Sequence, residues 1–132
     1  MMKYMIGADI GTTSTKAVLY DLKGNVKAYA NVGYPLYQNV PDMAEEDPDE
    51  IFEAVVEVLG KVMRKGHVQA GELQGVSFSA AMHSLILMDR NHQPLTRAIT
   101  WADNRAAKYS NELKANGLGH EIYQHTLSLI HI

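Results

Sequence analysis

The chain of 132 residues contains no cysteine, so disulfide bonds and thiolate metal sites are excluded. It also has no apolar run close to the ~18 residues that a membrane-spanning helix needs. Its formal net charge of −3 provides none of the basic excess that is typical of nucleic-acid binding. We therefore expect a cytoplasmic protein that binds neither nucleic acid nor membrane.

The length and composition are those of one globular domain, with 46% hydrophobic residues in 132. No repeat, low-complexity tract or linker divides the chain, so we predict a single domain over residues 1–132. We predict that residues 126–132 form an atypical tail.

Short apolar runs separated by turn residues predict an antiparallel three-stranded meander near the N-terminus. Its strands are expected at residues 4–10, 15–20 and 26–34. A loop should follow over residues 34–47, because this segment holds two prolines and shows no clear period.

Asp47 and Pro48 predict the start of a helix that ends near Gly66, because aspartate caps helices and proline suits the first helical position. Its expected apolar stripe contains Ile51, Phe52, Val55, Val56, Leu59, Val62 and Met63. The later elements are expected to be a strand at residues 73–79, an antiparallel strand pair at 85–88 and 97–101, and a helix at 103–116. This order predicts an α/β fold with a mixed sheet and flanking helices.

The most informative motif is Asp9-Ile-Gly-Thr-Thr-Ser-Thr-Lys16, which directly follows the first predicted strand. It combines backbone N–H groups, hydroxyls, a lysine and a carboxylate, which are the groups that a phosphate and its Mg²⁺ require. A Walker A loop is excluded, because the glycine spacing differs and a strand follows. The alternative is an ordinary hairpin in which aspartate and threonine are only good turn formers. The motif predicts nucleotide-dependent phosphoryl transfer.

The same motif resembles the first phosphate motif of the superfamily that contains sugar kinases, Hsp70 and actin. The stretches Ser77-Phe-Ser-Ala-Ala-Met-His83 and Ile99-Thr-Trp-Ala-Asp-Asn-Arg105 resemble segments of the FGGY carbohydrate kinases, and Glu45-Glu-Asp-Pro48 fits them too. This resemblance covers about residues 4–125. It implies a ribonuclease-H-like α/β fold, of which the chain would be an incomplete first domain.

The resemblance implies ATP and Mg²⁺ as cofactors. Asp9 would hold the metal, through water, while Gly11, Thr12 and Thr13 would approach the β- and γ-phosphates. Lys16 would also contact phosphate, or it is simply an exposed lysine on a strand.

The resemblance further implies a sugar pocket lined by Met82, His83, Trp101, Asp103 and Arg105. Such side chains suit a polyhydroxylated small molecule, and an arginine could also face the carboxylate of a sugar acid. Three of them have another interpretation. His83 could be a solvated loop histidine, Asp103 could cap the following helix, and Trp101 could belong to the core.

Met82-His83-Ser84, in place of Met-His-Gly, leans toward a gluconate kinase, with a xylulose kinase or another ketose or polyol kinase as the alternative. A non-catalytic binding module and a chaperone-like or actin-like ATPase are alternatives of another class. No catalytic residue is expected in this chain, because the aspartate base of such kinases would lie beyond residue 132. An incomplete domain leaves apolar surface uncovered, which favours a homo-oligomer.

Overall fold

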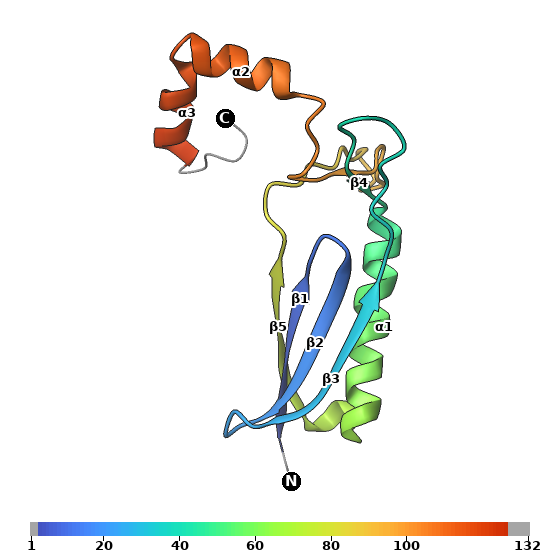
Figure 1. Cartoon of the computed structure of the whole chain (residues 1–132). Coiled ribbons are helices and arrows are strands. Elements are labelled where there is room, and N and C mark those ends of the chain that lie inside the picture. The colour runs from blue at the N-terminus through green and yellow to red at the C-terminus, as the bar shows by residue number, and fades with distance from the viewer. Residues whose placement is uncertain (1–2, 127–132) are drawn as a thin grey trace. The chain divides into compact units, whose positions relative to one another are not determined.

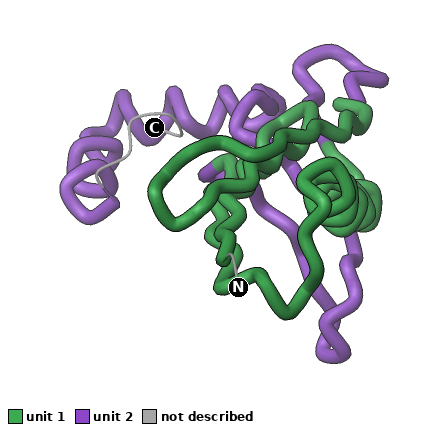
Figure 2. Tube along the Cα trace, turned by 90° about the horizontal axis from the view of Figure 1, so that it is seen from below, with its two compact units in different colours: residues 1–36, 46–81 green, residues 37–45, 82–132 purple. Residues whose placement is uncertain are grey.

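The computed structural model describes residues 3–126, which are drawn in colour in Figure 1. The chain divides into two compact units, shown in green and purple in Figure 2. Unit 1 comprises Met1–Leu36 and Glu46–Ala81, and unit 2 comprises Tyr37–Glu45 and Met82–Ile132. The single domain over residues 1–132 remains a prediction, and the predicted tail lies outside the described residues except for Thr126.

Unit 1 contains a four-stranded mixed sheet with the strand order β3-β2-β1-β5 (Figure 1). Neighbouring strands β1, β2 and β3 pair antiparallel, whereas β5 pairs parallel to β1. The strands are β1 (Tyr4–Ile10), β2 (Ser14–Asp21), β3 (Val26–Gly33) and β5 (Leu73–Ala80). The predicted meander and the predicted mixed sheet are therefore confirmed.

The long helix α1 (Pro48–Gly66) follows the capping signal read from the sequence. The side chain of Asp47 accepts a hydrogen bond from the backbone N–H of Asp49 at 3.0 Å, and Pro48 occupies the first turn. A short 3₁₀ helix, η1 (Ala70–Glu72), then leads into β5. Among the described residues, no helix is long and apolar enough to cross a membrane.

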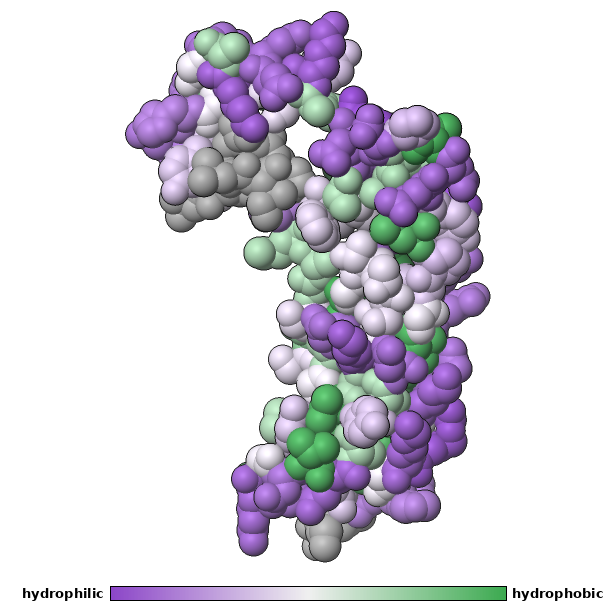
Figure 3. All heavy atoms as spheres, in the orientation of Figure 1, coloured by the Kyte–Doolittle hydropathy of each residue, from purple (hydrophilic) through white to green (hydrophobic). Residues whose placement is uncertain are grey.

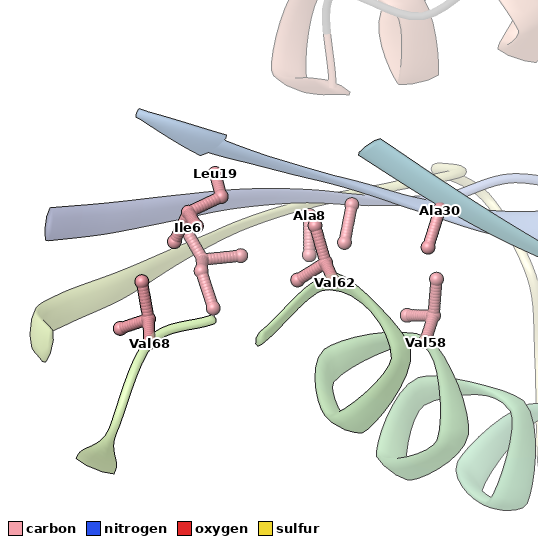
Figure 4. Packing of buried hydrophobic residues seen from close by; sticks show 8 residues of the cluster. Ile6, Ala8, Leu19, Ala30, Val58, Val62 and Val68 are labelled. Atoms are coloured by element: carbon pink, nitrogen blue, oxygen red, sulfur yellow. The ribbon is translucent and has the colours of Figure 1, made fainter. Parts of the chain in front are cut away.

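The core of unit 1 lies between the sheet and α1, and Figure 4 shows Val58 beneath Ala30 and Val62 close to Ala8. Small alanines on the strands let the helix approach the sheet closely. Near the end of the helix, a Cβ on Gly66 would lie 2.3 Å from Leu19 Cδ2, so any other residue there would force the buried Leu19 side chain to shift. The buried cluster consists of Ile6, Ala8, Ala17, Leu19, Ala30, Val58, Val62 and Val68.

The apolar stripe predicted for α1 is partly wrong. Phe52 and Val56 are 68% and 57% exposed, whereas Ala54 and Val58, which were not included, are buried. The sheet covers only the narrow helix face that repeats every fourth residue, so apolar side chains on the flank remain outside. On the face drawn in Figure 3, hydrophobic residues lie in separate groups among hydrophilic ones.

Unit 2 has little regular structure before its helices. A two-stranded sheet joins β4 (Glu45–Glu46), where the chain passes into unit 1, to β6 (Ala98–Ile99). The predicted strand pair is reduced to β6 and the isolated bridges Leu85–Ile99 and Met88–Pro94. The predicted loop at residues 34–47 contains β4, which no local pattern indicated. Two helices follow, α2 (Ala107–Ala115) and α3 (Leu118–Thr126), in place of the one expected at residues 103–116.

Candidate functional site

The predicted phosphate motif forms the hairpin that connects β1 to β2 (Figure 1). Gly11 begins its turn, and its backbone N–H donates to the carbonyl of Ser14 at 3.0 Å. A Cβ on Gly11 would lie 3.3 Å from that same oxygen, which is a tight contact that glycine avoids. The Gly11 amide is thus used inside the hairpin, and the contribution of Gly11 is the tight turn that it permits.

Asp9 and Lys16 are direct partners across the antiparallel strands β1 and β2. Both are exposed, whereas their strand neighbours Ala8, Thr15 and Ala17 are buried. Because side chains alternate along a strand, Asp9 and Lys16 lie on the sheet face opposite α1. The hairpin therefore presents a carboxylate and an ammonium group side by side, next to the hydroxyls of its turn.

Tyr34 follows β3 directly and contacts the hairpin at three points. Its hydroxyl donates to the carbonyl of Gly11. Its backbone N–H donates to the carbonyl of Thr13 at 3.1 Å. The hydroxyl of Thr15, a fully buried residue, lies 3.4 Å from the Tyr34 hydroxyl. Sequence reasoning assigned Tyr34 no role, because a tyrosine at a strand end carries no local signal of these contacts.

Glu46 is a buried carboxyl group, and its negative charge raises the pKa of Tyr34. Its side chain is 5% exposed, and Oε1 has no hydrogen-bond partner among the described residues. Burial raises the pKa of Glu46 to about 7. Burial also raises the pKa of Tyr34; the hydrogen bond with Thr15 acts against this rise and the charge of Glu46 adds to it. The Tyr34 hydroxyl therefore keeps its proton at neutral pH.

In unit 2, the predicted site residues Asp103 and Arg105 are joined in a charged network. Asp103 Oδ2 accepts a hydrogen bond from the backbone N–H of Ala44 at 2.9 Å. Arg105 Nε lies 3.1 Å from Asp103 Oδ1 and 2.9 Å from Oδ2, and its Nη2 lies 2.7 Å from Oδ2. The same Nη2 donates to Glu45 Oε1 at 2.5 Å. Arg105 is thus held by two carboxylates, and its Nη1 takes part in none of these bonds.

The charges of this network are stabilised by their partners. Burial disfavours ionised Asp103, but hydrogen bonds from Arg105 and Ala44 outweigh it and hold the pKa of this carboxyl below its usual value. The carboxylates of Asp103 and then Glu45 raise the pKa of the Arg105 guanidinium. Thr100, which is buried, adds a hydroxyl bond to the Ala44 carbonyl at 2.9 Å. The segment before α1 is therefore tied to the segment before α2.

Two alternatives raised for this segment are wrong. The cap residue of α2 is Ala106, which makes no side-chain capping bond, so Asp103 does not cap this helix. Its carboxylate is bound instead to Ala44 and Arg105, and the helix begins at Ala107, later than expected. Trp101 is 47% exposed and is therefore not a core residue.

Asp103 lines two hollows of the surface of unit 2. One has a volume of about 630 Å³, and its lining includes Glu45, Arg97, Asp103, Arg105 and Tyr109. The other has a volume of about 280 Å³ and is lined by Trp101, Asp103 and polar residues of α2. Of the predicted sugar-binding residues, Asp103 lines both hollows, Arg105 lines the first and Trp101 lines the second.

The other two predicted residues, Met82 and His83, belong to unit 2 but line neither of these hollows. Met82 is 70% exposed. His83 has a φ of 68°, in the left-handed region that non-glycine residues rarely adopt. Strain of this kind is often found at functional positions.

A model of the FGGY family of carbohydrate kinases, N-terminal domain, matches residues 4–132. The chain belongs to the FGGY family of carbohydrate kinases. Membership in this FGGY family separates the chain from the chaperone-like and actin-like ATPases, which were considered as alternatives. It also agrees with the α/β fold and mixed sheet expected from the sequence.

Among curated FGGY relatives, the gluconokinase of Bacillus licheniformis is 47% identical over 99% of this chain and 25% of the relative. The xylulose kinase of Bacillus subtilis strain 168 is 38% identical over 79% of this chain and 21% of the relative. A solved gluconate kinase from Lactobacillus acidophilus superposes with a TM-score of 0.87 at 43% identity, over 94% of this chain and 25% of that one. The chain therefore spans about a quarter of the length of these relatives.

Proposed function

We propose that this chain forms the N-terminal part of an ATP-dependent FGGY kinase that transfers the γ-phosphate to a hydroxyl of gluconate. The observation that carries the proposal is the presence, in one chain, of the Asp9–Lys16 hairpin and the Asp103–Arg105 network. The first provides groups for a phosphate and the second provides groups for a polyol with a carboxylate. Two gluconokinases, at 47% and 45% identity, support this choice of substrate.

The hairpin would bind the phosphate end of ATP. Asp9 presents an exposed carboxylate at the end of β1, which fits a Mg²⁺ that takes one or two carboxylates and completes its shell with phosphate oxygens and water. When bound, the metal would neutralise charge on the phosphates. Thr12 and Thr13 would donate to phosphate oxygens, and Gly11 would keep the turn tight. Lys16 lies on the same face as Asp9, which supports a phosphate contact.

The Asp103–Arg105 network would bind the sugar acid. Arg105 is held rigidly by Asp103 and Glu45, and its Nη1 remains for a carboxylate oxygen. Trp101 offers a partly exposed apolar face for the carbon skeleton. Met82 and His83 would complete the pocket. The aspartate that takes the hydroxyl proton is expected beyond residue 132, so no residue of this chain acts as the base.

A xylulose kinase is the second candidate, with other ketose or polyol kinases behind it. A ligand-bound xylulose kinase from Lactobacillus acidophilus superposes with a TM-score of 0.86, also at 43% identity, over 92% of this chain and 24% of that one. Structural similarity therefore favours neither sugar. The curated relatives favour the sugar acid, because the two gluconokinases are 47% and 45% identical and the xylulose kinase of Bacillus subtilis is 38% identical.

Use of ATP implies a cytoplasmic setting, where this nucleotide is abundant. Self-association is a further part of the proposal, because several large apolar side chains are exposed. They include Phe52, Val56, Phe78, Leu87 and Tyr109.

A longer kinase that contains this chain provides the test. It should phosphorylate gluconate with ATP and Mg²⁺ at a higher kcat/KM than xylulose, glycerol or ribulose. The 132-residue chain should show no sugar-dependent ATP turnover, because the catalytic base lies outside it. A preference for xylulose would select the second candidate, and failure to phosphorylate any of these sugars would overturn the proposal.

A matched pair of variants tests the hairpin in the same assay. Asp9→Asn should lower kcat roughly 10- to 100-fold, as expected when a metal-holding carboxylate loses its charge. The control Asp21→Asn alters the opposite end of the same strand pair, where Tyr4 is its partner. It should change kcat by less than about twofold, because Asp21 lies outside the phosphate motif. Equal kcat values for both variants would exclude the role of Asp9.

A further inference from the structure

Tyr34 lies outside the phosphate motif and yet contacts two carbonyl groups of its turn. The hydroxyl bond reaches Gly11 and the backbone bond reaches Thr13, so a single residue holds both sides of the turn. All three residues belong to unit 1, in which the hairpin and β3 are neighbouring parts of one sheet. The turn is therefore restrained from the β3 side by a residue distant in sequence.

These bonds determine the direction of a peptide group. In a trans peptide, the C=O of one residue and the N–H of the next point in opposite directions. The described residues contain no cis peptide bond. Because the Gly11 carbonyl is held toward the Tyr34 hydroxyl, the N–H of Thr12 points away from Tyr34. The bond to Thr13 prevents the other side of the turn from rotating.

We propose that Tyr34 is a positioning residue that aims the Thr12 amide of the hairpin at a phosphate oxygen of the nucleotide. This inference rests on the proposed function, because it assigns a ligand to the hairpin. It adds a residue that neither the motif nor the family match distinguishes. Tyr34 itself would touch neither the nucleotide nor the sugar.

The surroundings of Tyr34 suit a permanent donor. A tyrosine hydroxyl has one proton, and here that proton is directed to the Gly11 carbonyl. The hydroxyl of Thr15 can then donate to the tyrosine oxygen, at 3.4 Å. Thr15 is fully buried, so its hydroxyl is shielded from competing water. Burial raises the pKa of Tyr34, so the donor keeps its proton at neutral pH.

The test uses Tyr34→Phe in the longer kinase, because phenylalanine keeps the ring and removes only the hydroxyl. The control is Tyr29→Phe, in which the hydroxyl is removed from a ring on β3 that is 71% exposed. Tyr34→Phe should raise the KM for ATP and lower kcat, each roughly tenfold, as for a lost outer contact of a binding group. The KM for the sugar should stay within about twofold, and Tyr29→Phe should change none of these values.

A purely structural role would lower thermal stability and leave both KM values unchanged, and this result would overturn the inference. Hydrogen exchange of residues 9–20 gives a readout besides activity, and it should be faster in Tyr34→Phe than in Tyr29→Phe. If Tyr34→Phe does not fold, Thr15→Val removes the donor to the tyrosine oxygen, and it should raise the KM for ATP in the same direction by a smaller factor.

Failure of the inference can be distinguished from failure of the proposed function. An active wild-type kinase with an unchanged KM for ATP in Tyr34→Phe overturns the role of Tyr34 alone. A wild-type protein that phosphorylates none of the sugars but binds Mg²⁺-ATP, more weakly after Tyr34→Phe, overturns the proposed function and supports the inference. A wild-type protein that binds no Mg²⁺-ATP in calorimetry overturns both.

Discussion

Unit 1 buries nine apolar residues, eight of them in one cluster, whereas the buried apolar residues of unit 2, among those described, are Ala44 and Ala98. In place of a packed layer, unit 2 uses Asp103, Arg105 and Thr100 to tie its segments together. Hydrophobic packing holds a fold without directing a particular group at a ligand, whereas charged hydrogen bonds fix the direction of each donor. The candidate sugar-binding groups lie in the polar unit.

The pKa values of two carboxyl groups, one in each unit, also differ in direction. Burial without a hydrogen-bond donor raises the pKa of Glu46 in unit 1 to about 7. Asp103 in unit 2 is half-buried, but donors from Arg105 and Ala44 outweigh its desolvation and lower its pKa. The partners that surround a carboxyl group, and not its depth alone, therefore decide its charge.

The largest expected effect concerns the packing of unit 1. Leu19→Ala should lower the free energy of unfolding of the chain by roughly 2–5 kcal/mol, because Leu19 is fully buried beneath α1. The control Leu22→Ala, at a residue that is 60% exposed, should cost less than about 0.5 kcal/mol. Urea unfolding followed by circular dichroism measures both values. Equal costs would contradict the packed core.

The next effect depends on pH. Burial raises the pKa of Glu46 to about 7, well above the ordinary value of 4.5, so the contribution of this residue to stability is greatest below pH 4.5 and is lost as pH rises through 7. The loss is at most roughly 3 kcal/mol. Glu46→Gln should make the urea midpoint nearly constant between about pH 5 and pH 8.

The control for this prediction is Glu53→Gln, because Glu53 is an exposed glutamate on α1. It should keep the pH dependence of the wild-type chain. A wild-type urea midpoint that does not fall as pH rises would show that Glu46 is not buried without a partner.

The smallest effect concerns the network of unit 2. Asp103→Asn should destabilise the segments before α1 and α2 by about 1–2 kcal/mol, because Arg105 loses one of its two carboxylates. Hydrogen exchange of residues 42–45 and 99–105 should be faster, and the core strands of unit 1 should be unaffected. Asp42→Asn is the matched control, because asparagine tolerates the φ of 65° at this position.

The pH dependence of this contribution has the opposite sign to that of Glu46. Since the folded pKa of Asp103 is lowered, its stabilisation is present above the ordinary pKa near 4 and is lost as pH falls through the folded pKa. Protection of residues 99–105 that is unchanged in acid would argue against the network.

Local signals were sufficient for much of unit 1. The strands before Tyr34, the start of α1 at Pro48 and the hairpin motif depend on alternation, capping and turn residues that are neighbours in sequence. The exposed position of Phe52 was missed, because an apolar residue on a helix flank shows no sign of how wide the covering sheet is. The proposed roles of the motif residues themselves remain predictions.

Unit 2 was predicted less well, because its structure depends on distant partners. Asp103 was considered as a helix cap on local grounds, yet its carboxylate binds the backbone of Ala44, 59 residues away. Likewise, β4 and β6 are each two residues long and pair with each other across the sequence, which no periodicity indicates.

The sequence by itself determined the family, the α/β class and the phosphate hairpin, because each follows from a contiguous motif or a local period. Only the tertiary structure decided that Tyr34 holds this hairpin, that Glu46 is buried without a donor and that Arg105 is fixed between two carboxylates. The physical reason is that hydrogen bonds and burial depend on groups brought together by folding, and a residue's neighbours in the chain do not specify them.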